Sequence, residues 1–233
     1  MSRYREIIYP KDDKNRYPKK LAEYIYNRFM KSYHSDTVPK ILDIGCSAGN
    51  ALRLFSECGD LELFGIDIRD ENISGIEFKQ CNLEKDPLPF PDDFFDFVYS
   101  KSVLEHVRNT DNFLSESLRV LKPNGIFIGL TPDWNSQHEI FWDDYTHVKP
   151  FTRKGLRDAL KIHGMVGADC EFFYQLPILW KYPRLTFFIK LIAAILPDSW
   201  KWKDNEHRNT KDRKLIRFSK EIMLLSYGKK SLK

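Results

Sequence analysis

The chain has 233 residues, enough for one domain with a sizeable apolar core and too few for two full domains. Hydrophobic residues make up 42% and charged residues 30%, a balance typical of a folded globular protein rather than a disordered one. The formal net charge of +4 is small, and much of it comes from the last third of the chain. No concentrated basic face is evident in the sequence, which argues against a nucleic-acid partner.

The cysteine pattern and the apolar stretches bear on the cellular compartment of the protein. The four cysteines show no paired spacing, so we expect reduced, buried thiols in a cytoplasmic protein. The charged first twenty residues contain no apolar segment of the kind found in a secretory signal. Residues 172–196 are apolar but interrupted by charges and a proline, so they do not qualify as a membrane span. We expect extra helices at the sheet edge, with a lid or an in-plane contact with a membrane surface as alternatives.

Up to residue 131, strand-like runs alternate with helical ones. Residues 18–33 have apolar positions at helical spacing and predict an N-terminal amphipathic helix. The predicted strands are 40–45, 61–67, 76–83, 94–100 and 126–131, and the predicted helices between them are 51–58 and 111–121. This alternation favours a parallel sheet covered by helices on both faces, an α/β fold.

Beyond residue 131 the pattern loosens, but a single domain still accounts for it. Thr152 is a good cap for a helix ending near residue 163, and two further strands are predicted at 166–174 and 221–227. We therefore expect one domain over residues 1–233. Its predicted parts are a helical extension (1–36), a cofactor-binding core (40–131), two substrate or lid insertions (132–151 and 174–219) and a final strand (220–228).

The most informative run is Ile41-Leu-Asp-Ile-Gly-Cys-Ser-Ala-Gly-Asn50, directly after the first strand. A sharp strand-to-helix turn needs glycine where a ligand approaches the backbone. Asp67 ends the next strand, where a carboxylate can accept hydrogen bonds from both ribose hydroxyls of a nucleoside. Ser47 and Asn50 replace the second and third glycines of the dinucleotide fingerprint, so a pyrophosphate fits poorly and a nicotinamide oxidoreductase is disfavoured. A nucleoside without phosphate fits better, the alternative being a generic strand–turn–helix.

The run DIGCSAG (43–49) resembles motif I of the class I S-adenosylmethionine-dependent methyltransferases. Residues 81–100, SVLEHV (102–107) and LRVLKPNGI (118–126) resemble later segments of that family, in the same order. The resemblance implies a Rossmann-like sheet of seven strands in the order 3-2-1-4-5-7-6, with the last strand antiparallel. It also implies S-adenosyl-L-methionine as the cofactor.

Carried over residue by residue, the resemblance implies a cofactor pocket. The methionine end would be shaped by Asp43, Gly45, Cys46 and Gly49, and Ser100 would lie near the sulfonium. Asp67 would hold the ribose. Ile68 would pack on the adenine, and Asn82 and Leu83 would face the adenine amino group. Ser47 stands for the usual middle glycine and Asn82 for the usual aspartate, and we expect neither to abolish binding. Core packing is an equally good account of Cys46 and Leu83.

Methyl transfer to a hydroxyl needs a base, and histidine suits that task near neutral pH. Of six histidines, His106 and His147 follow the fourth and fifth strands, whose ends border the ligand crevice of such sheets. We expect His147 to act as the base, oriented by Asp144 or Tyr145, with His106 as a second candidate. A purely structural role is the alternative for either histidine. The spacing of the nearby aspartates is not diagnostic of a metal, so we expect no metal site.

The acceptor is indicated more weakly than the cofactor. Residues 145–152 resemble a segment of small-molecule methyltransferases, including ones linked to sugar and cell-surface polysaccharide modification. We therefore expect O-methylation of a sugar, nucleotide-sugar or other small-molecule hydroxyl by in-line displacement. The alternatives are a lipid-linked acceptor at a membrane surface, reached through 172–196, or a non-catalytic cofactor-binding subunit. The fourth strand ends in Tyr99-Ser-Lys-Ser, which lacks the motif of enzymes that methylate nucleobase amines.

Overall fold

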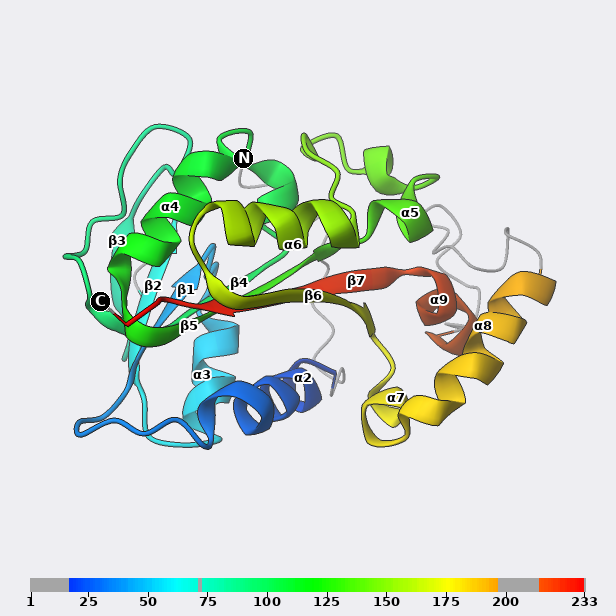
Figure 1. Cartoon of the computed structure of the whole chain (residues 1–233), viewed down its shortest axis with the longest axis horizontal. Coiled ribbons are helices and arrows are strands. Elements are labelled where there is room, and N and C mark those ends of the chain that lie inside the picture. Colours follow the sequence, from blue (N-terminus) through cyan, green and yellow to red (C-terminus); the bar gives the residue numbers. More distant parts are fainter. Residues whose placement is uncertain (1–16, 71–72, 197–213, 233) are drawn as a thin grey trace.

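The computed structural model describes residues 17–70, 73–196 and 214–232 (Figure 1). Residues 1–16 of the expected N-terminal extension and residues 197–213 of the second expected insertion, with His207, lie outside the described residues.

A seven-stranded sheet forms the centre of the described part of the chain (Figure 1). Its strands are β1 Lys40–Ile44, β2 Glu62–Asp67, β3 Glu77–Gln80, β4 Phe95–Lys101, β5 Leu121–Pro132, β6 Val166–Tyr174 and β7 Ile222–Lys229. They lie in the order β3-β2-β1-β4-β5-β7-β6. The pairings from β3 to β5 are parallel, and β7 runs antiparallel to both β5 and β6. The α/β fold, the strand order and the antiparallel last strand expected from the sequence are confirmed.

Helices cover both faces of this sheet, as a parallel sheet requires. The structure has α2 at Tyr17–Ile25, continued by a π-helical turn at Tyr26–Met30, α3 at Asn50–Ser56, α4 at Thr110–Val120 and α6 at Arg153–Ile162. Apolar side chains of α4 and α6 belong to one core cluster, and those of α2 and α3 belong to another. Figure 1 shows these two pairs of helices on opposite sides of the strands. The Thr152 hydroxyl accepts a hydrogen bond from the N–H of Gly155, as expected for the cap of α6.

Two strands differ in length from their sequence prediction. β3 is shorter than the predicted 76–83, whereas β5 begins five residues before the predicted 126. The Pro123–Gly125 stretch, which has the composition of a turn, is an irregular part of β5: Asn124 has φ +64°, and the pairing with β4 shifts register between Phe95 and Phe97. The strand therefore tolerates a proline and a left-handed residue where it is locally disrupted.

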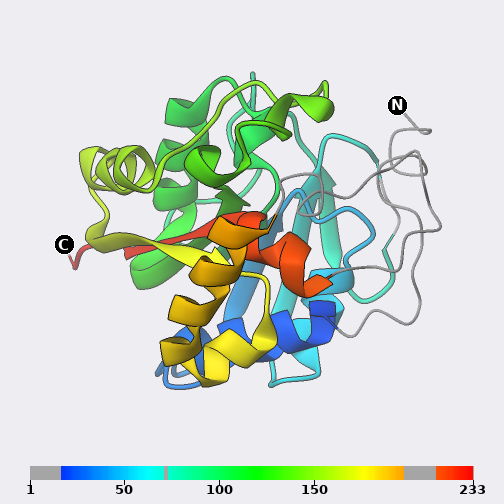
Figure 2. The same cartoon turned by 90° about the vertical axis from the view of Figure 1, so that its right-hand side faces the viewer.

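The segments between the later strands gather at one end of the sheet. The 132–151 loop contains α5 (Trp134–Gln137) and a 3₁₀ turn at Phe141–Asp143. Between β6 and β7 lie α7 (Pro177–Lys181), a 3₁₀ turn (Pro183–Leu185), α8 (Thr186–Ile195) and α9 (Lys214–Lys220). Figures 1 and 2 place α5, α8 and α9 at the end of the sheet where β5 finishes and β7 starts. Within the residues described, no helix combines the length and the apolarity that crossing a bilayer requires.

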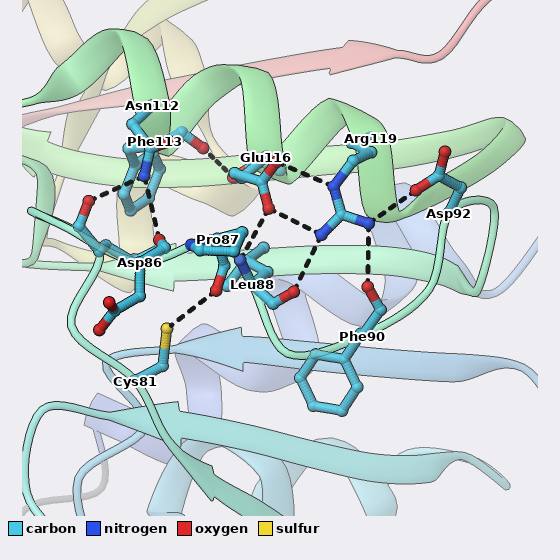
Figure 3. A network of polar contacts seen from close by, with 12 residues as sticks. Cys81, Asp86, Pro87, Leu88, Phe90, Asp92, Asn112, Phe113, Glu116 and Arg119 are labelled. Atoms are coloured by element: carbon cyan, nitrogen blue, oxygen red, sulfur yellow. Dashed lines mark hydrogen bonds and ion pairs between the residues drawn. The ribbon is translucent and has the colours of Figure 1, made fainter.

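Arg119, near the end of α4, fastens the segment that precedes β4 (Figure 3). Its guanidinium donates to the carbonyls of Leu88 and Phe90, both at 2.9 Å, and to the Asp92 carboxylate at 2.7 Å. Glu116 accepts from Arg119 through both oxygens, at 2.8 and 2.7 Å, and also from the N–H of Leu88 at 2.7 Å. The hydrogen bond from Arg119 is the main reason why the pKa of Glu116 is lowered. These contacts hold residues 88–92, which precede β4, in one conformation.

Candidate functional site

The turn after β1 has glycine at the two positions where the backbone is left-handed and crowded. Gly45 has φ +77° and Gly49 has φ +73°. A Cβ on Gly45 would lie 2.4 Å from Cγ2 of Val103, and one on Gly49 would lie 2.4 Å from Cδ1 of Ile76. Sequence reasoning attributed these glycines to the approach of a ligand. In the structure the protein's own side chains already require them.

Asp67 ties the end of β2 to this turn. One carboxylate oxygen accepts from the N–H of Ser47 at 3.0 Å, and the other accepts from the N–H of Arg69 at 3.1 Å. Ser47, which stands for a usual glycine, itself has φ +52°, so a glycine there would be less strained. Directly after Asp67, the Ile68 side chain is 50% exposed and offers an apolar surface beside the carboxylate.

The other expected cofactor residues either pack in the apolar core or form local hydrogen bonds. Cys46 and Leu83 are buried in the apolar core, in agreement with the packing alternative for both. The Asn82 side chain accepts from the N–H of Glu84 at 3.1 Å, which holds it in a local turn after β3. Ser100 is buried near the end of β4, and its hydroxyl donates to the carbonyl of Ile44 at 3.3 Å.

Ionisable groups meet at the neighbouring ends of β1 and β4. Burial, with the nearby carboxylate of Asp67, raises the pKa of Asp43 to about 8, while Lys101 acts in the opposite direction. Burial lowers the pKa of Lys101 against the attraction of Glu105 and Asp43. Burial also raises the pKa of Glu105, which accepts a 2.8 Å hydrogen bond from the Thr131 hydroxyl. Sequence reasoning did not single out Lys101 or Glu105, because a charge beside an apolar strand looks solvated until the fold buries it.

The two candidate bases come together in space. His106 ends a 3₁₀ turn after β4, and its ring centroid is 4.8 Å from that of His147. Nδ1 of His147 lies 2.6 Å from the carbonyl oxygen of Phe141, which can only accept. We infer that neutral His147 carries its lone pair on Nε2, 3.9 Å from the Asp144 carboxylate. The Thr146 hydroxyl donates to Asp144 at 2.7 Å and lies 2.9 Å from Nδ1 of His106. Asp144 is therefore linked to both histidines.

Glu105 joins the end of β4 to the loop that carries His147. Its buried backbone carbonyl accepts from the N–H of Val148 at 2.8 Å and from that of Lys149 at 3.1 Å. One potential metal-ligand atom from each of Glu105, His106 and His147 lies within 4.8 Å of the other two. Sequence spacing, which predicted no metal site, cannot reveal this proximity because it arises only when the two loops fold together.

Tyr145, the other residue expected to orient His147, lies outside this cluster and is 81% exposed. The aromatic residues of the same loop divide into a buried and an exposed set. Phe141 is buried, and its ring is 4.4 Å from that of His147 and 5.5 Å from that of Trp134. Trp142 is 53% exposed. Phe141 therefore anchors the loop beneath His147, while Trp142 and Tyr145 remain accessible.

A cavity of about 280 Å³ lies away from these residues, between α2 and the second half of α3. Lys19, Tyr26, Leu54 and Glu57 are among its lining residues, and none of the expected site residues is. The cavity therefore does not change the placement of the candidate site.

Comparison with known proteins decides the class of this fold. Residues 42–129 match the family model described as a methyltransferase domain. A curated relative, 2-methyl-6-phytyl-1,4-hydroquinone methyltransferase from Synechocystis sp., is 26% identical over 192 residues. The matched region is 71% of this chain and 58% of the relative, so the chain spans less than two thirds of that relative's length.

Solved structures show the same fold around the methyltransferase domain. A Haloferax volcanii protein, solved in complex with the Trm112 methyltransferase activator, has a TM-score of 0.67 and 19% identity, over 95% of this chain and 91% of that one. Phosphoethanolamine N-methyltransferase 2 from Haemonchus contortus, solved with S-adenosyl-L-methionine, has a TM-score of 0.60 and 16% identity, over 92% and 52%. The class I fold, the enzyme class of the domain and S-adenosylmethionine as the cofactor of that class are confirmed.

Proposed function

We propose that this protein transfers a methyl group from S-adenosylmethionine to a small-molecule hydroxyl. The observation that carries the proposal is the pair of carboxylates beside the glycine turn, Asp43 and Asp67. Asp67 lies close enough to raise the pKa of Asp43, so the turn holds the charge of Asp67 and a carboxyl of Asp43 that ionises more readily when a cation binds beside it. An anionic pyrophosphate is disfavoured there, whereas a nucleoside that carries an ammonium and a sulfonium charge is favoured.

The residues at this turn fit such a cofactor. Each carboxylate oxygen can accept two hydrogen bonds. Asp67 accepts from the N–H of Ser47 on one oxygen and from the N–H and, at 3.4 Å, the Nε–H of Arg69 on the other, so it keeps capacity for one ribose hydroxyl and gains a second when the guanidinium moves aside. The exposed Ile68 offers an apolar surface for the adenine. We assign the methionine end to Asp43, Gly45 and Gly49, with Cys46, Leu83 and Ser100 packing behind the pocket. We assign Asn82, whose side chain accepts from the N–H of Glu84, to the adenine end. When bound, the cofactor supplies a methyl group on an activated sulfonium.

The histidine cluster supplies the base for the acceptor. The lone pair on Nε2 of His147 can take the proton of an acceptor hydroxyl, and the Asp144 carboxylate at 3.9 Å stabilises the imidazolium that results. The Phe141 carbonyl fixes the tautomer and the orientation of the ring. His106, linked to Asp144 through Thr146, is the second candidate base. Two adjacent imidazoles under one carboxylate favour proton removal over a purely structural role.

The chemical class of the methyl acceptor is defined less closely than the cofactor. The curated relative is named for a hydroquinone that bears a phytyl chain, and this name supports a lipid-soluble hydroquinone as the acceptor molecule. The expected sugar or nucleotide-sugar hydroxyl has no such support from the comparisons. It remains the second candidate, favoured by the exposed Trp142 and Tyr145, whose rings suit stacking on a sugar face.

The test is transfer of labelled methyl groups to a panel of prenylated hydroquinones, nucleotide-sugars and glycans. We expect label in a hydroxyl-bearing acceptor with the wild-type chain and its loss in Asp67→Ala, assayed well below the Tm measured for that variant. Label in no acceptor of the panel, with S-adenosylmethionine bound, would support the non-catalytic alternative instead.

A further inference from the structure

Helix α8 presents an apolar side to solvent that the fold does not cover. Phe187, Phe188, Leu191 and Ile195 are 68%, 58%, 49% and 70% exposed, respectively. At 3.6 residues per turn these four lie on one side of the helix, here called the outer face. The opposite side, which includes Ile189, packs in a small apolar cluster with residues of α7 and α9. Because α8 already has an inner side that holds it in place, folding does not require large apolar side chains on the outer face.

Positive charge surrounds the outer face. Residues 177–195 contain Lys181, Arg184 and Lys190 and no acidic residue, and all three cations are exposed. Apolar side chains flanked by cations are the pattern of a helix that lies in the interface of a membrane with anionic lipids. With 10 residues, α8 is too short to cross a bilayer and long enough to lie flat on one. Ile178 and Tyr182, just before it, are also more than half exposed.

A second copy of the chain is a poorer occupant of this surface. In a twofold contact the same patch meets itself, so the Lys181, Arg184 and Lys190 cations of both copies would be brought together. No acidic residue of 177–195 is present to neutralise them. Protein interfaces also tend to be depleted of lysine. An anionic lipid surface supplies the missing negative charge and takes up the apolar side chains.

The outer face lies at the end of the molecule where the candidate site is built. Figures 1 and 2 place α8 and α9 where β5 finishes and β7 starts, the end from which the loops with His106 and His147 leave. We propose that the outer face of α8, with its flanking cations, docks the protein on an anionic bilayer surface. The docking rests on residues 177–195 alone and goes beyond the proposed function. Together they allow an acceptor dissolved in the bilayer to be methylated where it lies.

Co-sedimentation of the full chain with vesicles tests the docking. Vesicles of phosphatidylcholine mixed with phosphatidylglycerol are compared with vesicles of phosphatidylcholine alone. We expect binding to the anionic vesicles that weakens as salt is added. Each cation near an anionic surface contributes a factor of about five, so Lys181→Glu/Arg184→Glu/Lys190→Glu should weaken binding by on the order of a hundredfold or more. Phe187→Ser/Leu191→Ser should abolish it at any salt concentration.

The matched control is Lys161→Glu/Ile162→Ser, which changes a cation and an exposed apolar side chain at the end of α6. It should bind vesicles as the wild type does. Absence of binding, equal binding to both vesicle types, or an equal loss in the control would overturn the proposal. So would a stable dimer in solution that Phe187→Ser/Leu191→Ser converts to monomer without any vesicle binding. Thermal unfolding followed by circular dichroism shows whether each variant is folded, and calorimetry with S-adenosylhomocysteine in the absence of vesicles reports separately on the proposed function.

Discussion

Two carboxylates distinguish the turn after β1 from a turn built for phosphate. Asp43 is buried and Asp67 nearly so, and neither forms an ion pair with a fully buried cation. The Arg69 guanidinium approaches Asp67 at 3.4 Å from a partly exposed position, and Lys101 offsets the charge of Asp43 only in part. The charge of Asp67, joined by that of Asp43 once a bound cation favours its ionisation, suits a cationic nucleoside and opposes an anionic one.

Asp43 should make cofactor binding depend on pH. Its pKa is about 8 in the folded protein, because of burial and the neighbouring Asp67. A ligand with an ammonium group binds the ionised carboxylate better, so the affinity for S-adenosylhomocysteine should rise from pH 6 to pH 8 by up to about tenfold per unit. Calorimetry across this range measures the slope. Asp43→Asn, which is isosteric and does not ionise, should bind more weakly and remove most of the slope.

The same shift has a consequence for stability. Asp43 keeps its proton in the folded state between pH 4 and pH 8, whereas the unfolded chain loses it near pH 4. Folding becomes less favourable over this interval as the pH rises, since the folded state binds more protons than the unfolded one. Asp43→Asn should therefore raise Tm more at pH 8 than at pH 5. An equal Tm change at both values would contradict the buried, protonated carboxyl.

His147 should matter for the rate of methyl transfer and not for cofactor affinity. His147→Asn is expected to lower kcat by about 100-fold to 10,000-fold and to remove the acidic limb of the pH–rate profile, as loss of a general base does. The measurement uses the acceptor identified by the labelling panel, with His106→Asn assayed in parallel. His163→Asn, at the end of α6, is the matched control and should retain activity. Near-wild-type rates in both His147→Asn and His106→Asn would remove histidine from the chemistry.

The candidate site was predictable from the sequence to different degrees. The proximity of Asp43, Gly45, Gly49 and Asp67 was predictable because they belong to one contiguous turn and the strand that follows. The meeting of His106 and His147 could be expected only from the convergence of strand ends. The burial of Lys101 could not be foreseen, because it depends on how the ends of β1 and β4 pack.

At the scale of elements, the link between α4 and the segment before β4 carries much of the local order. Arg119→Ala would remove the hydrogen bonds that Arg119 donates to four residues. It would also leave the Glu116 carboxylate, whose side chain is only 12% exposed, without its cation. We expect unfolding to become easier by about 3 kcal/mol, since breaking a partly buried ion pair strands the remaining charge. Chemical denaturation measures this loss. Arg119→Lys keeps the charge but not the forked geometry and should recover only part of it; full recovery would show that the carbonyl contacts contribute nothing.

The elements themselves were mostly predictable, and the exceptions have local causes. β6 occupies the predicted residues because its flanks, Gly164 and Pro177, are strong boundary signals. β5 was predicted too short because Pro123–Gly125 has the composition of a turn, yet the strand absorbs it as an irregularity. The short helix α5 escaped prediction because four residues carry no periodicity, although the Asp133 side chain caps it by accepting from the N–H of Ser136.

At the scale of the whole molecule, one end of the sheet collects the features that matter. The glycine turn and the histidine loop follow the carboxyl ends of β1 and β5, and α8 lies at the same end of the sheet (Figure 1). This follows from topology, because loops at that end of an open parallel sheet converge on the crevice where ligands bind. A sequence that encodes the strand order therefore also determines which of its loops can cooperate.

Calorimetric titration of the purified chain with S-adenosylmethionine, S-adenosylhomocysteine and NAD⁺ tests the central claim most directly. The acidic turn predicts saturable binding of the first two, no binding of the dinucleotide, and an affinity loss of about 100-fold in Asp67→Ala, where two charge-assisted hydrogen bonds to the ribose are removed. Binding of NAD⁺ instead, or no heat from any of the three ligands with a folded protein, would contradict the account.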